Sequence, residues 1–529
     1  MTYVPKTTAF SHQARIFDET KDLDGYALFW EQGTGKTKPT IDTFCHRLEQ
    51  GDVDTLLVVA PAGVHLNWVT DELPAHMPDR HLSRALCLAW RSASSTTKWH
   101  EKAVEALYRH DGPVVLCIPF DSWITERAKK AAWKLLSKRK VMMVVDEGIQ
   151  IKNPAAKRSI SIIAAGAHAK VRRLLNGTPV ANEPWDVYSQ IKFVNQQFWY
   201  PHELDGYETF KSHFGKWKKI EEKDGRPAFD LCVGYRRLDE LQTILKTVSD
   251  RVLKEDVLDL PKKLYNKARF DMTPEQLRHY TAIKSEFMTW LDSCDPCEGC
   301  KGAGRLECSS VQNEETGLFE SYESVCELCN GTGFAKGGLI AAELAIVRML
   351  RFQQITSGYL PTPVGEELSF QHMKENPRLD RMMKGISTMP HSAIIWNRFQ
   401  EDGRLVCEAI QKAGLTCARY DGTVSEKQRA MNKEMFQKGE AQFFVANPAA
   451  IATGVTLNIA KSTIYYSNTF NLIHRLQSED RNHRIGQDCS VLYTDLIANQ
   501  SIDEGIVDAL RSKVDIAAQV TGDRLKAWI

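Results

Sequence analysis

Two series of short apolar, β-prone segments, separated by stretches of helical pattern, set the strongest limit on the fold of this chain. The first series lies at 27–30, 55–60, 113–118, 141–145 and 173–175. The second series lies at 393–396, 416–420, 442–446, 462–466 and 490–496. Continuous apolar runs joined by helical crossovers are typical of parallel strands that are buried on both faces. The sequence therefore predicts an α/β protein with two RecA-like lobes, each a parallel sheet flanked by helices.

The length of the chain, 529 residues, corresponds to about two to four domains at roughly 150 residues each. We expect an N-terminal ATPase lobe at 1–260, which includes a helical insertion at about 196–250, and a C-terminal lobe at 376–529. The intervening region, 261–375, is expected to form a linker and a helical protrusion. Within it, the Gly- and Cys-rich stretch 294–338 breaks any helical period and is expected to form a small unit of its own.

Charge and hydropathy exclude several classes of protein. Lys and Arg number 68 and Asp and Glu 67, so any contact with nucleic acid must come from local patches. No stretch approaches about 18 consecutive apolar residues, and the N-terminus has no basic start followed by an apolar run. We therefore expect a cytoplasmic protein with no membrane partner.

The segment after the first apolar run has the pattern of a phosphate-binding loop, because a strand leads into glycines and then into a helical stretch. Gly33 and Gly35 would let backbone N–H groups turn toward a triphosphate. Lys36 would reach the β and γ phosphates, and the Thr37 hydroxyl would ligate Mg²⁺. The strict pattern fails at its first position, where Trp30 stands. A glycine turn beside a chance lysine is the alternative interpretation.

A pair of carboxylates, Asp146 and Glu147, follows the apolar run at 141–145. The carboxyl edge of a parallel sheet is where ligands bind. Asp146 would hold Mg²⁺ through its water shell, and Glu147 would orient and deprotonate an attacking water. A surface loop with two acidic residues is the alternative, and the phosphate-binding loop favours the catalytic interpretation.

A charged segment near the C-terminus, Gln477 to Gln487, places Arg481 and Arg484 three residues apart, so they would share a face of a helix. Arginines brought from a second domain onto a γ-phosphate stabilise charge in the transition state and make hydrolysis depend on domain closure. A solvated charged helix is the alternative for this segment.

These segments resemble the Swi/Snf-type double-stranded DNA translocases of helicase superfamily two, and the resemblance runs from about Phe10 to Arg511. Further matching segments are 10–13 (the adenine-reading Q motif), 58–61 with 66–68 (motif Ia), 175–179 with Asn182 (motif III), 251–261 with 272–276, 349–355, 420–423 with Arg429, and 483–487. The resemblance implies two RecA-like lobes with ATP and Mg²⁺ in the cleft. The implied nucleotide ligands are Gln13, Gly33, Thr34, Gly35, Lys36, Thr37 and Asp146, and the implied catalytic residues are Lys36, Asp146, Glu147, Gln477, Arg481 and Arg484.

The chain departs from the family pattern at three motifs. Where Asp-Glu-Ala-His is usual, it has Asp-Glu-Gly-Ile, so the polar group expected at Ile149 is missing. Motif V has Ile451, Ala452 and Thr456 where glycines and an asparagine are usual, and Asn176 replaces the threonine of motif III. These changes leave hydrolysis possible and put the coupling of ATP to DNA movement in question.

The resemblance also implies that double-stranded or branched DNA lies across both lobes through phosphate contacts, with weak sequence preference and strong salt dependence. Two groups of basic residues are candidate surfaces. They are Lys129, Lys130, Lys134, Lys138 and Arg139, and separately Lys211, Lys216, Lys218 and Lys219 beside Trp217. A solvated helix face is the alternative for each group.

Six of the 13 cysteines lie between Cys294 and Cys329, and four of them form two copies of the pattern C-x-x-C-x-G-x-G. The copies begin at Cys297 with Cys300 and at Cys326 with Cys329. Two thiolates at each tight turn predict a closed tetrahedral Zn²⁺ site, and the half-motif resembles the zinc knuckles of DnaJ chaperones. Cys294 and Cys308 complicate the ligand assignment, and a redox or disulfide pair is the alternative. The site could guide DNA, dock a protein or only stabilise the fold.

The leading hypothesis is an ATP-dependent translocase on double-stranded DNA that remodels DNA structures or protein–DNA complexes, as in DNA repair or recombination. A strand-separating or branch-migration helicase is a second hypothesis. A non-catalytic, ATP-gated binding module is a third, and the complete hydrolytic set argues against it. We expect a monomer, because both halves of the ATP site lie in one chain, and the compact length suggests a bacterial or phage protein. Protein partners are not predicted.

Overall fold

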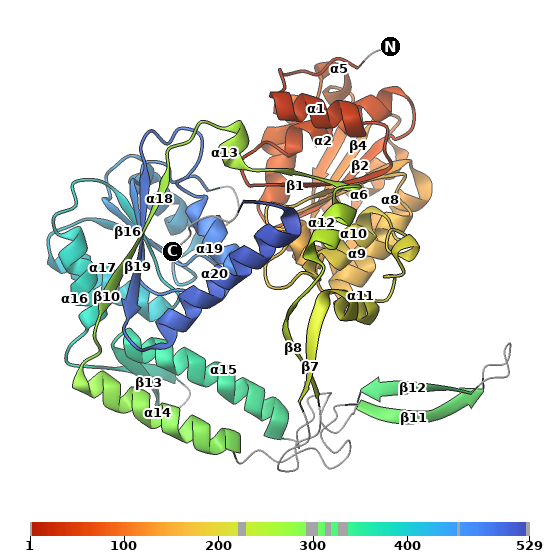
Figure 1. Ribbon diagram of the computed structural model, residues 1–529. Helices are drawn as coiled ribbons and strands as arrows, with labels where there is room; N and C mark the ends of the chain where they lie inside the picture. The colour runs from red at the N-terminus through yellow and green to blue at the C-terminus, as the bar shows by residue number, and fades with distance from the viewer. Residues whose placement is uncertain are drawn as a thin grey trace.

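Each series of apolar segments forms one parallel sheet in the computed structural model, and the two sheets lie side by side in separate lobes (Figure 1). This confirms the expected α/β architecture. The structure describes residues 3–220, 229–292, 305–312, 319–325, 337–364, 367–451 and 455–524.

The sheet of the first lobe has seven parallel strands in the order β3-β4-β2-β5-β6-β1-β9. They are β1 (Gly25–Trp30), β2 (Thr55–Ala60), β3 (Leu86–Ala89), β4 (Val114–Pro119), β5 (Val141–Asp146), β6 (Val171–Leu175) and β9 (Ser249–Val252). All residues of β2, β4 and β5 are buried, as expected of strands covered by helices on both faces. Two strands were not predicted. The edge strand β3 is only half-buried, and β9 has a polar sequence.

Helices cover both faces of this sheet. They are α1 (Ser11–Thr20), α2 (Thr37–Glu49), α3 (Val64–Asn67), α4 (Leu73–His76), α5 (Asp79–Leu82), α6 (Lys98–Arg109), α7 (Phe120–Trp123), α8 (Glu126–Lys138), α9 (Lys157–Ala167), α10 (Asp186–Val194), α11 (Tyr207–Phe214) and α12 (Leu238–Leu245). Helix α8 shows how the sequence determines where a helix begins and which face it buries. The Thr125 hydroxyl accepts a hydrogen bond from the Ala128 N–H at its start. Its Ala and Leu residues recur every three or four positions and form the buried stripe.

The segment 196–250, expected to be a helical insertion, contains more than helices. Between α11 and α12 lies an antiparallel hairpin of β7 (Gly215–Ile220) and β8 (Phe229–Tyr235). The strand β9 ends the segment and joins the first sheet beside β1. The strands β7 and β9 carry many charged or polar residues, so a search for apolar runs does not find them.

The sheet of the second lobe has six parallel strands in the order β10-β19-β18-β15-β17-β16. They are β10 (Lys263–Phe270), β15 (Ala393–Trp396), β16 (Cys417–Tyr420), β17 (Phe443–Ala446), β18 (Ser462–Tyr465) and β19 (Val491–Ala498). The helices of this lobe are α16 (Pro377–Ile386), α17 (Gln400–Lys412), α18 (Glu426–Gln437), α19 (Leu472–Glu479) and α20 (Ile502–Thr521). The linker at 261–375 therefore supplies the edge strand β10, which the sequence analysis did not predict.

The rest of the linker projects from the second lobe. It contains α14 (Pro274–Asp292), α15 (Gly337–Thr356) and two antiparallel hairpins, β11 (Arg305–Gln312) with β12 (Phe319–Val325) and β13 (Tyr359–Val364) with β14 (Glu367–His372). The short helix α13 (Lys254–Val257) follows β9 at the point where the chain leaves the first lobe. Among the described residues, no helix combines the length and apolarity needed to cross a bilayer.

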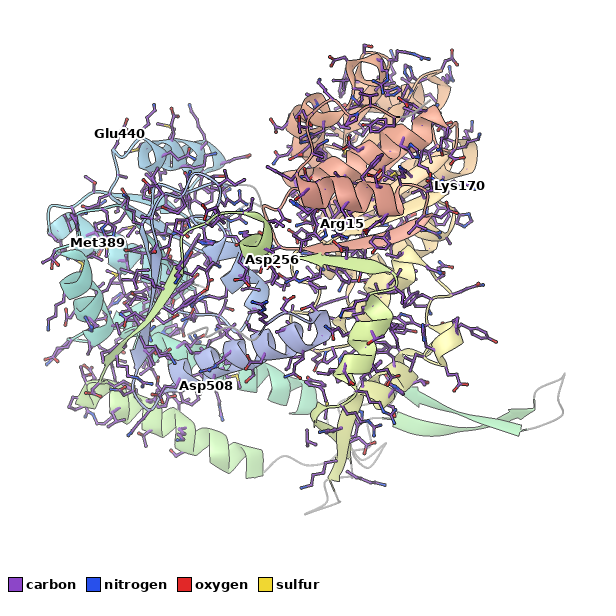
Figure 2. The ribbon with its side chains drawn as sticks, turned by 45° about the horizontal axis from the view of Figure 1, so that its top comes forward. Arg15, Lys170, Asp256, Met389, Glu440 and Asp508 are labelled. Atoms are coloured by element: carbon purple, nitrogen blue, oxygen red, sulfur yellow. The ribbon has the colours of Figure 1, made fainter. Side chains whose placement is uncertain are left out.

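The helix α20 joins the two lobes. It follows β19 of the second lobe and packs on α12 of the first, and Val520 near its end lies in the core of the first lobe (Figure 1). Figure 2, turned by 45°, shows the same helix, marked by Asp508, extending toward the first lobe. The two lobes therefore contact each other through a packed helix as well as through the chain crossing at α13.

Candidate nucleotide-binding cleft

The loop between β1 and α2 has the backbone conformation that a phosphate-binding loop requires. Gly33 has φ 84° and Gly35 has φ 80°, a left-handed region in which other residues are strained. The Lys36 ammonium lies inside the loop and donates hydrogen bonds to the carbonyl oxygens of Trp30, at 2.9 Å, and Glu31, at 3.2 Å. Burial lowers the pKa of Lys36. The phosphates of a nucleotide would take the place of these carbonyl oxygens as partners of the ammonium.

The helix α1 holds this loop from one side. The Gln13 amide nitrogen donates to the Gly35 carbonyl oxygen at 2.9 Å, and its amide oxygen accepts from the Phe10 N–H at 2.9 Å. The His12 ring nitrogen lies 2.9 Å from the Thr34 carbonyl oxygen. A Cβ atom on Gly35 would lie 2.3 Å from the Gln13 amide nitrogen, so a larger residue there would displace the Gln13 side chain from the loop. The structure thus brings Gln13, Thr34 and Gly35 together.

The expected carboxylates lie at the carboxyl end of β5, which runs between β2 and β6 in the sheet. The Trp68 indole N–H donates to Asp146 Oδ2 at 3.0 Å, and the Gln32 amide donates to Glu147 Oε1 at 2.8 Å. Burial is the main cause of a raised pKa at both acids, and the pKa of Glu147 rises to about 7. A carboxylate with a pKa near neutrality is suited to accept a proton from water.

The unusual residues after Glu147 belong to the core of the first lobe. A Cβ atom on Gly148 would lie 2.7 Å from Leu174 Cδ2, which explains why alanine does not fit at this position. Ile149 is 3% exposed and lies in a 3-10 turn. Apolar packing therefore replaces the polar group that the family carries there.

Arg481 and Arg484 lie in a turn, not on a helix as predicted, because α19 ends at Glu479. The cause is the buried side chain of Asn482. Its amide donates to Thr463 Oγ1 at 3.0 Å and its oxygen accepts from the Tyr493 hydroxyl at 3.1 Å. These bonds hold the chain against β18 and β19 and end the helical path.

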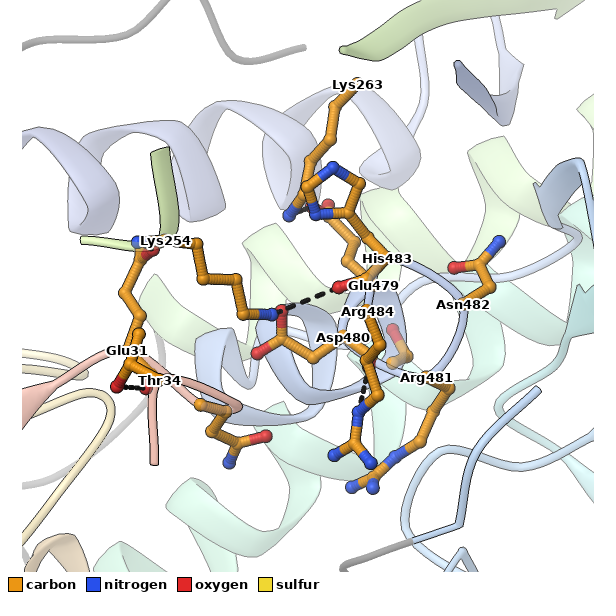
Figure 3. Close-up of polar contacts among 12 residues, drawn as sticks. Glu31, Thr34, Lys254, Lys263, Glu479, Asp480, Arg481, Asn482, His483 and Arg484 are labelled. Carbon is orange, nitrogen blue, oxygen red and sulfur yellow. Dashed lines mark hydrogen bonds and ion pairs between the residues drawn. The ribbon is translucent and has the colours of Figure 1, made fainter. Parts of the chain in front are cut away.

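The turn nevertheless presents the two arginines together, and Figure 3 shows their guanidinium groups pointing to the same side. Among the described residues neither forms an ion pair with a carboxylate, and Arg481 is 2% exposed. Burial and the neighbouring charge of Arg484 lower the pKa of Arg481 to about 10. The positive charge of Arg481 acts on Glu147 and opposes the rise of its pKa. The second lobe thus directs positive charge at the carboxylate of the first.

Two other predicted positions near the arginines can be placed. Gln477 lies half-buried on α19. Thr456, one of the unusual motif V residues, accepts a hydrogen bond from Arg484 Nη1 at 3.2 Å. Ala452 lies outside the described residues, and Ile451 is buried in the core of the second lobe.

Lys254 connects the lobes, and the sequence analysis did not identify it. Its backbone N–H donates to Glu31 Oε2 at 2.7 Å, beside the phosphate-binding loop. Its ammonium pairs with Asp480 Oδ1 at 2.5 Å and donates to the His483 carbonyl oxygen at 3.2 Å, both in the arginine turn (Figure 3). Its two sets of partners lie more than 200 positions apart in the sequence, so no local spacing reveals the link.

A second link was also missed. Arg251 in β9 donates to the carbonyl oxygens of Phe29, at 2.7 Å, and Gly177, at 3.3 Å. The same guanidinium pairs with Asp523 through two hydrogen bonds of 3.0 and 2.7 Å. The end of α20 is thus tied to the strand that carries the phosphate-binding loop.

Two cavities lie near these residues. One of about 530 Å³ lies between the lobes and is lined by residues that include Glu31, Thr178, Lys254 and Asp480. The other, of about 230 Å³, lies in the second lobe where β15, β17 and β18 end, and its polar lining includes Arg398, Asn447, Asn468, Thr469 and His474. The sequence analysis did not predict the second cavity, although polar residues after successive strand ends are the signal that could have found it.

The predicted zinc ligands Cys297, Cys300, Cys326 and Cys329 lie outside the described residues, as does Cys294. Cys308 belongs to β11. The described part of the chain contains no cluster of three or more His, Cys, Asp or Glu residues able to hold a metal ion, and those cysteines lie outside that part.

The cleft fits a nucleotide with Mg²⁺. Its loop turns at Gly33 and Gly35, half-buried Lys36 supplies a positive charge, and Asp146 supplies a carboxylate beside it. Thr37 begins α2, where backbone N–H groups are not used within the helix and attract anions. Two parallel-sheet lobes with such a loop on one and paired arginines on the other define an ATPase of helicase superfamily two.

Comparison with known families identifies the chain more closely. The SNF2-related domain matches residues 17–312, more than half of the chain, and the helicase conserved C-terminal domain matches residues 377–486. The chain belongs to the SNF2-related family.

Several characterised proteins are similar over most of this chain. The SWI/SNF chromatin-remodeling complex subunit snf22 of Schizosaccharomyces pombe is 22% identical, over 93% of this chain and 26% of its own length. The putative ATP-dependent helicase/translocase YwqA of Bacillus subtilis is 24% identical, over 94% and 46%. The Sulfolobus solfataricus SWI2/SNF2 ATPase core in complex with dsDNA is 22% identical, covers 99% of this chain and 96% of its own, and has a TM-score of 0.39. The chain thus spans about a quarter of the length of snf22 and about half of the length of YwqA.

Proposed function

We propose that this protein is an ATP-dependent translocase that moves on double-stranded DNA and remodels DNA structures or protein–DNA complexes. The observation that carries the proposal is the pair Arg481 and Arg484. Arg481 is buried and Arg484 is half-buried, and cations withdrawn from water without a carboxylate partner are costly unless an anion joins them. They face the lobe that carries the phosphate-binding loop, so a γ-phosphate between the lobes would supply that anion.

The residues of the cleft divide the work of hydrolysis. Lys36 and the loop N–H groups bind the phosphates, and Thr37 with Asp146 would hold Mg²⁺, which neutralises phosphate charge when bound. Gln13 would contact the adenine. Glu147, with a pKa of about 7, orients water and accepts its proton, and Gln32 holds the carboxylate in place.

Coupling to DNA would follow from the dependence of the site on both lobes. The arginines reach the phosphate only when the lobes close, and Lys254 already links Glu31 to Asp480 across the cleft. Each ATP cycle would then open and close the cleft and move the lobes relative to the duplex. The relatives support this, since their names include a chromatin-remodeling complex subunit and a putative ATP-dependent helicase/translocase.

The two copies of C-x-x-C-x-G-x-G support a structural Zn²⁺ held by Cys297, Cys300, Cys326 and Cys329. The predicted boundaries at 1–260, 261–375 and 376–529 remain part of this proposal, as does a cytoplasmic, bacterial or phage setting.

The test is ATP turnover without nucleic acid and with single-stranded DNA, double-stranded DNA or RNA, using Lys36→Ala as the blank. We expect strong stimulation by duplex DNA that Lys36→Ala abolishes, followed by displacement of a triplex-forming strand. Stimulation by single strands or RNA alone would indicate a strand-separating helicase instead. No turnover under any condition would leave an ATP-gated binding module.

A further inference from the structure

The hairpin β7–β8 and the helix α8 carry the two basic groups of the sequence, and the structure separates them. Of the five basic side chains predicted as a surface on or just after α8, three are already paired. Lys129 pairs with Glu126, Lys134 with Glu105, and Arg139 with Asp54. Much of the positive charge of α8 is therefore neutralised within the first lobe.

The lysines of β7, unlike most basic residues of the α8 group, have no acidic partner among the described residues. Lys216, Lys218 and Lys219 are exposed, and within the described part of the chain none of them forms an ion pair or a side-chain hydrogen bond. The fourth lysine, Lys211, belongs to α11 and pairs with Glu208. Positive charge without a partner is thus concentrated on the strand itself.

Among the described residues of the hairpin, one acidic side chain lies beside these lysines. Asp230 of β8 is opposite Lys219 in the strand register, without an ion pair between them among the described residues. Arg236, just after β8, adds a positive charge, and among the described residues its side chain donates to the carbonyl oxygens of Ser212 and His213. The tip, 221–228, contains three acidic and two basic residues in the sequence and lies outside the described residues.

The base of the hairpin is held firmly on the first lobe. The Trp217 ring stacks on Trp185, with ring centres 6.0 Å apart and an angle of 17°, and Tyr235 meets the Trp185 ring edge-on at 5.4 Å. The Trp217 indole N–H also donates to the Lys211 carbonyl oxygen at 3.2 Å. Because the base is packed, the lysines are carried on a rigid element, and Trp217 remains 37% exposed beside them.

The hairpin projects from the first lobe on the side where α14 and α15 project from the second (Figure 1), and Figure 2 shows the same arrangement. A duplex that contacts both lobes could therefore also meet an element far from the nucleotide cleft. Phosphate oxygens are the chemistry that a row of unpaired lysines recognises.

We infer that β7 is a second contact with the DNA duplex, in which Lys216, Lys218 and Lys219 bind backbone phosphates outside the two-lobe cleft. This inference rests on the proposed function. The contact adds affinity that is independent of sequence and keeps the first lobe on the duplex while the cleft opens.

The test measures the salt dependence of duplex binding by the full chain. Fluorescence anisotropy with a labelled 30-base-pair duplex is recorded without nucleotide between 50 and 200 mM KCl. The variant Lys216→Gln/Lys218→Gln/Lys219→Gln is compared with Lys102→Gln/Lys130→Gln/Lys138→Gln, which removes the same charge from exposed, unpaired positions of α6 and α8. Circular dichroism checks that both variants fold.

Each phosphate contact contributes about 0.9 to the slope of log Kobs against log salt, so loss of three should flatten the slope by about 2.7. Between 50 and 200 mM KCl, the loss of affinity of the β7 variant should therefore be about 40-fold smaller than that of the unaltered chain. We expect the α6/α8 variant to keep the original slope. An unchanged slope in the β7 variant, or an equal loss in the α6/α8 variant, would overturn the inference alone. Failure of the unaltered chain to bind duplex DNA would overturn the proposed function with it.

Discussion

Glu147→Gln should stabilise the nucleotide-free protein at pH 8 and have almost no effect on its stability near pH 4.5. The reason is that the fold makes ionisation of this side chain unfavourable. An unfolded chain ionises its glutamates with a pKa of about 4.5, whereas burial raises the pKa of Glu147 to about 7. When Glu147 is ionised, as its proposed role in hydrolysis requires, it lowers the stability of the folded state.

The size and sign of the effect follow from the two pKa values. Below pH 4.5 the side chain is protonated in both states, so the folded state has no penalty. Between 4.5 and 7 the unfolded chain ionises first, and stability falls as pH rises until the penalty is complete above pH 7. The penalty is about 3.5 kcal/mol, since the two pKa values differ by about 2.5 and each tenfold change in the equilibrium is worth about 1.4 kcal/mol. Because Glu147 is only partly buried, we expect about 2 kcal/mol of it to be measured.

Calorimetric melting of the nucleotide-free chain at pH 5 and pH 8 measures the effect. For a lobe of this size, 2 kcal/mol corresponds to about 4 to 8 °C in the melting temperature. Glu101→Gln, on the exposed face of α6, removes the same charge and should shift the melting temperature little at either pH. A Glu147→Gln shift that is equal at the two pH values would refute the reasoning. The same substitution should abolish ATP turnover.

Three further predictions concern other contacts. Trp68→Phe removes the indole donor to Asp146 Oδ2 and should raise the Mg²⁺ concentration for half-maximal ATP turnover by about tenfold. Trp68 also packs in the core of the first lobe, so turnover is measured well below the melting temperature of the variant. Lys254→Met leaves Asp480 without its ammonium partner and should lower the free energy of unfolding by about 2 to 3 kcal/mol in urea, whereas exposed Lys262→Met should not. Elemental analysis should find one zinc per chain, lost in Cys297→Ser/Cys326→Ser; an unaltered chain without zinc would contradict the assignment.

Local patterns were enough to predict the central strands of both sheets and the position of the glycine turn after β1. A strand buried on both faces must be apolar along its length, so β2, β4 and β5 stand out in the sequence. The positions of Gly33, Gly35 and Lys36 follow from the backbone that a phosphate loop needs. For the same reason, the position of the carboxylates after β5, at the edge of the sheet, follows from the sequence pattern alone.

Edge strands and turns were less predictable, because their conformation depends on contacts with residues that are distant in the sequence. The strand β10 alternates polar and apolar residues and pairs with β19, more than 200 positions later. In the arginine turn, Arg481 and Arg484 are three positions apart, a spacing that would also place them on one face of a helix. What ends the helix is the burial of Asn482 between Thr463 and Tyr493, and only the folded sheet creates that site.

The same limit decides which lysines can bind DNA. The basic residues of α8 and β7 look alike in the sequence, where both form short runs beside aromatic residues. Their difference lies in Glu105 and Asp54, which pair with Lys134 and Arg139 from other elements of the first lobe. A charge satisfied in this way would have to lose its partner before binding a phosphate, whereas the lysines of β7 only have to lose water and counterions. Charge available for binding therefore depends on the fold as much as on the count of basic residues.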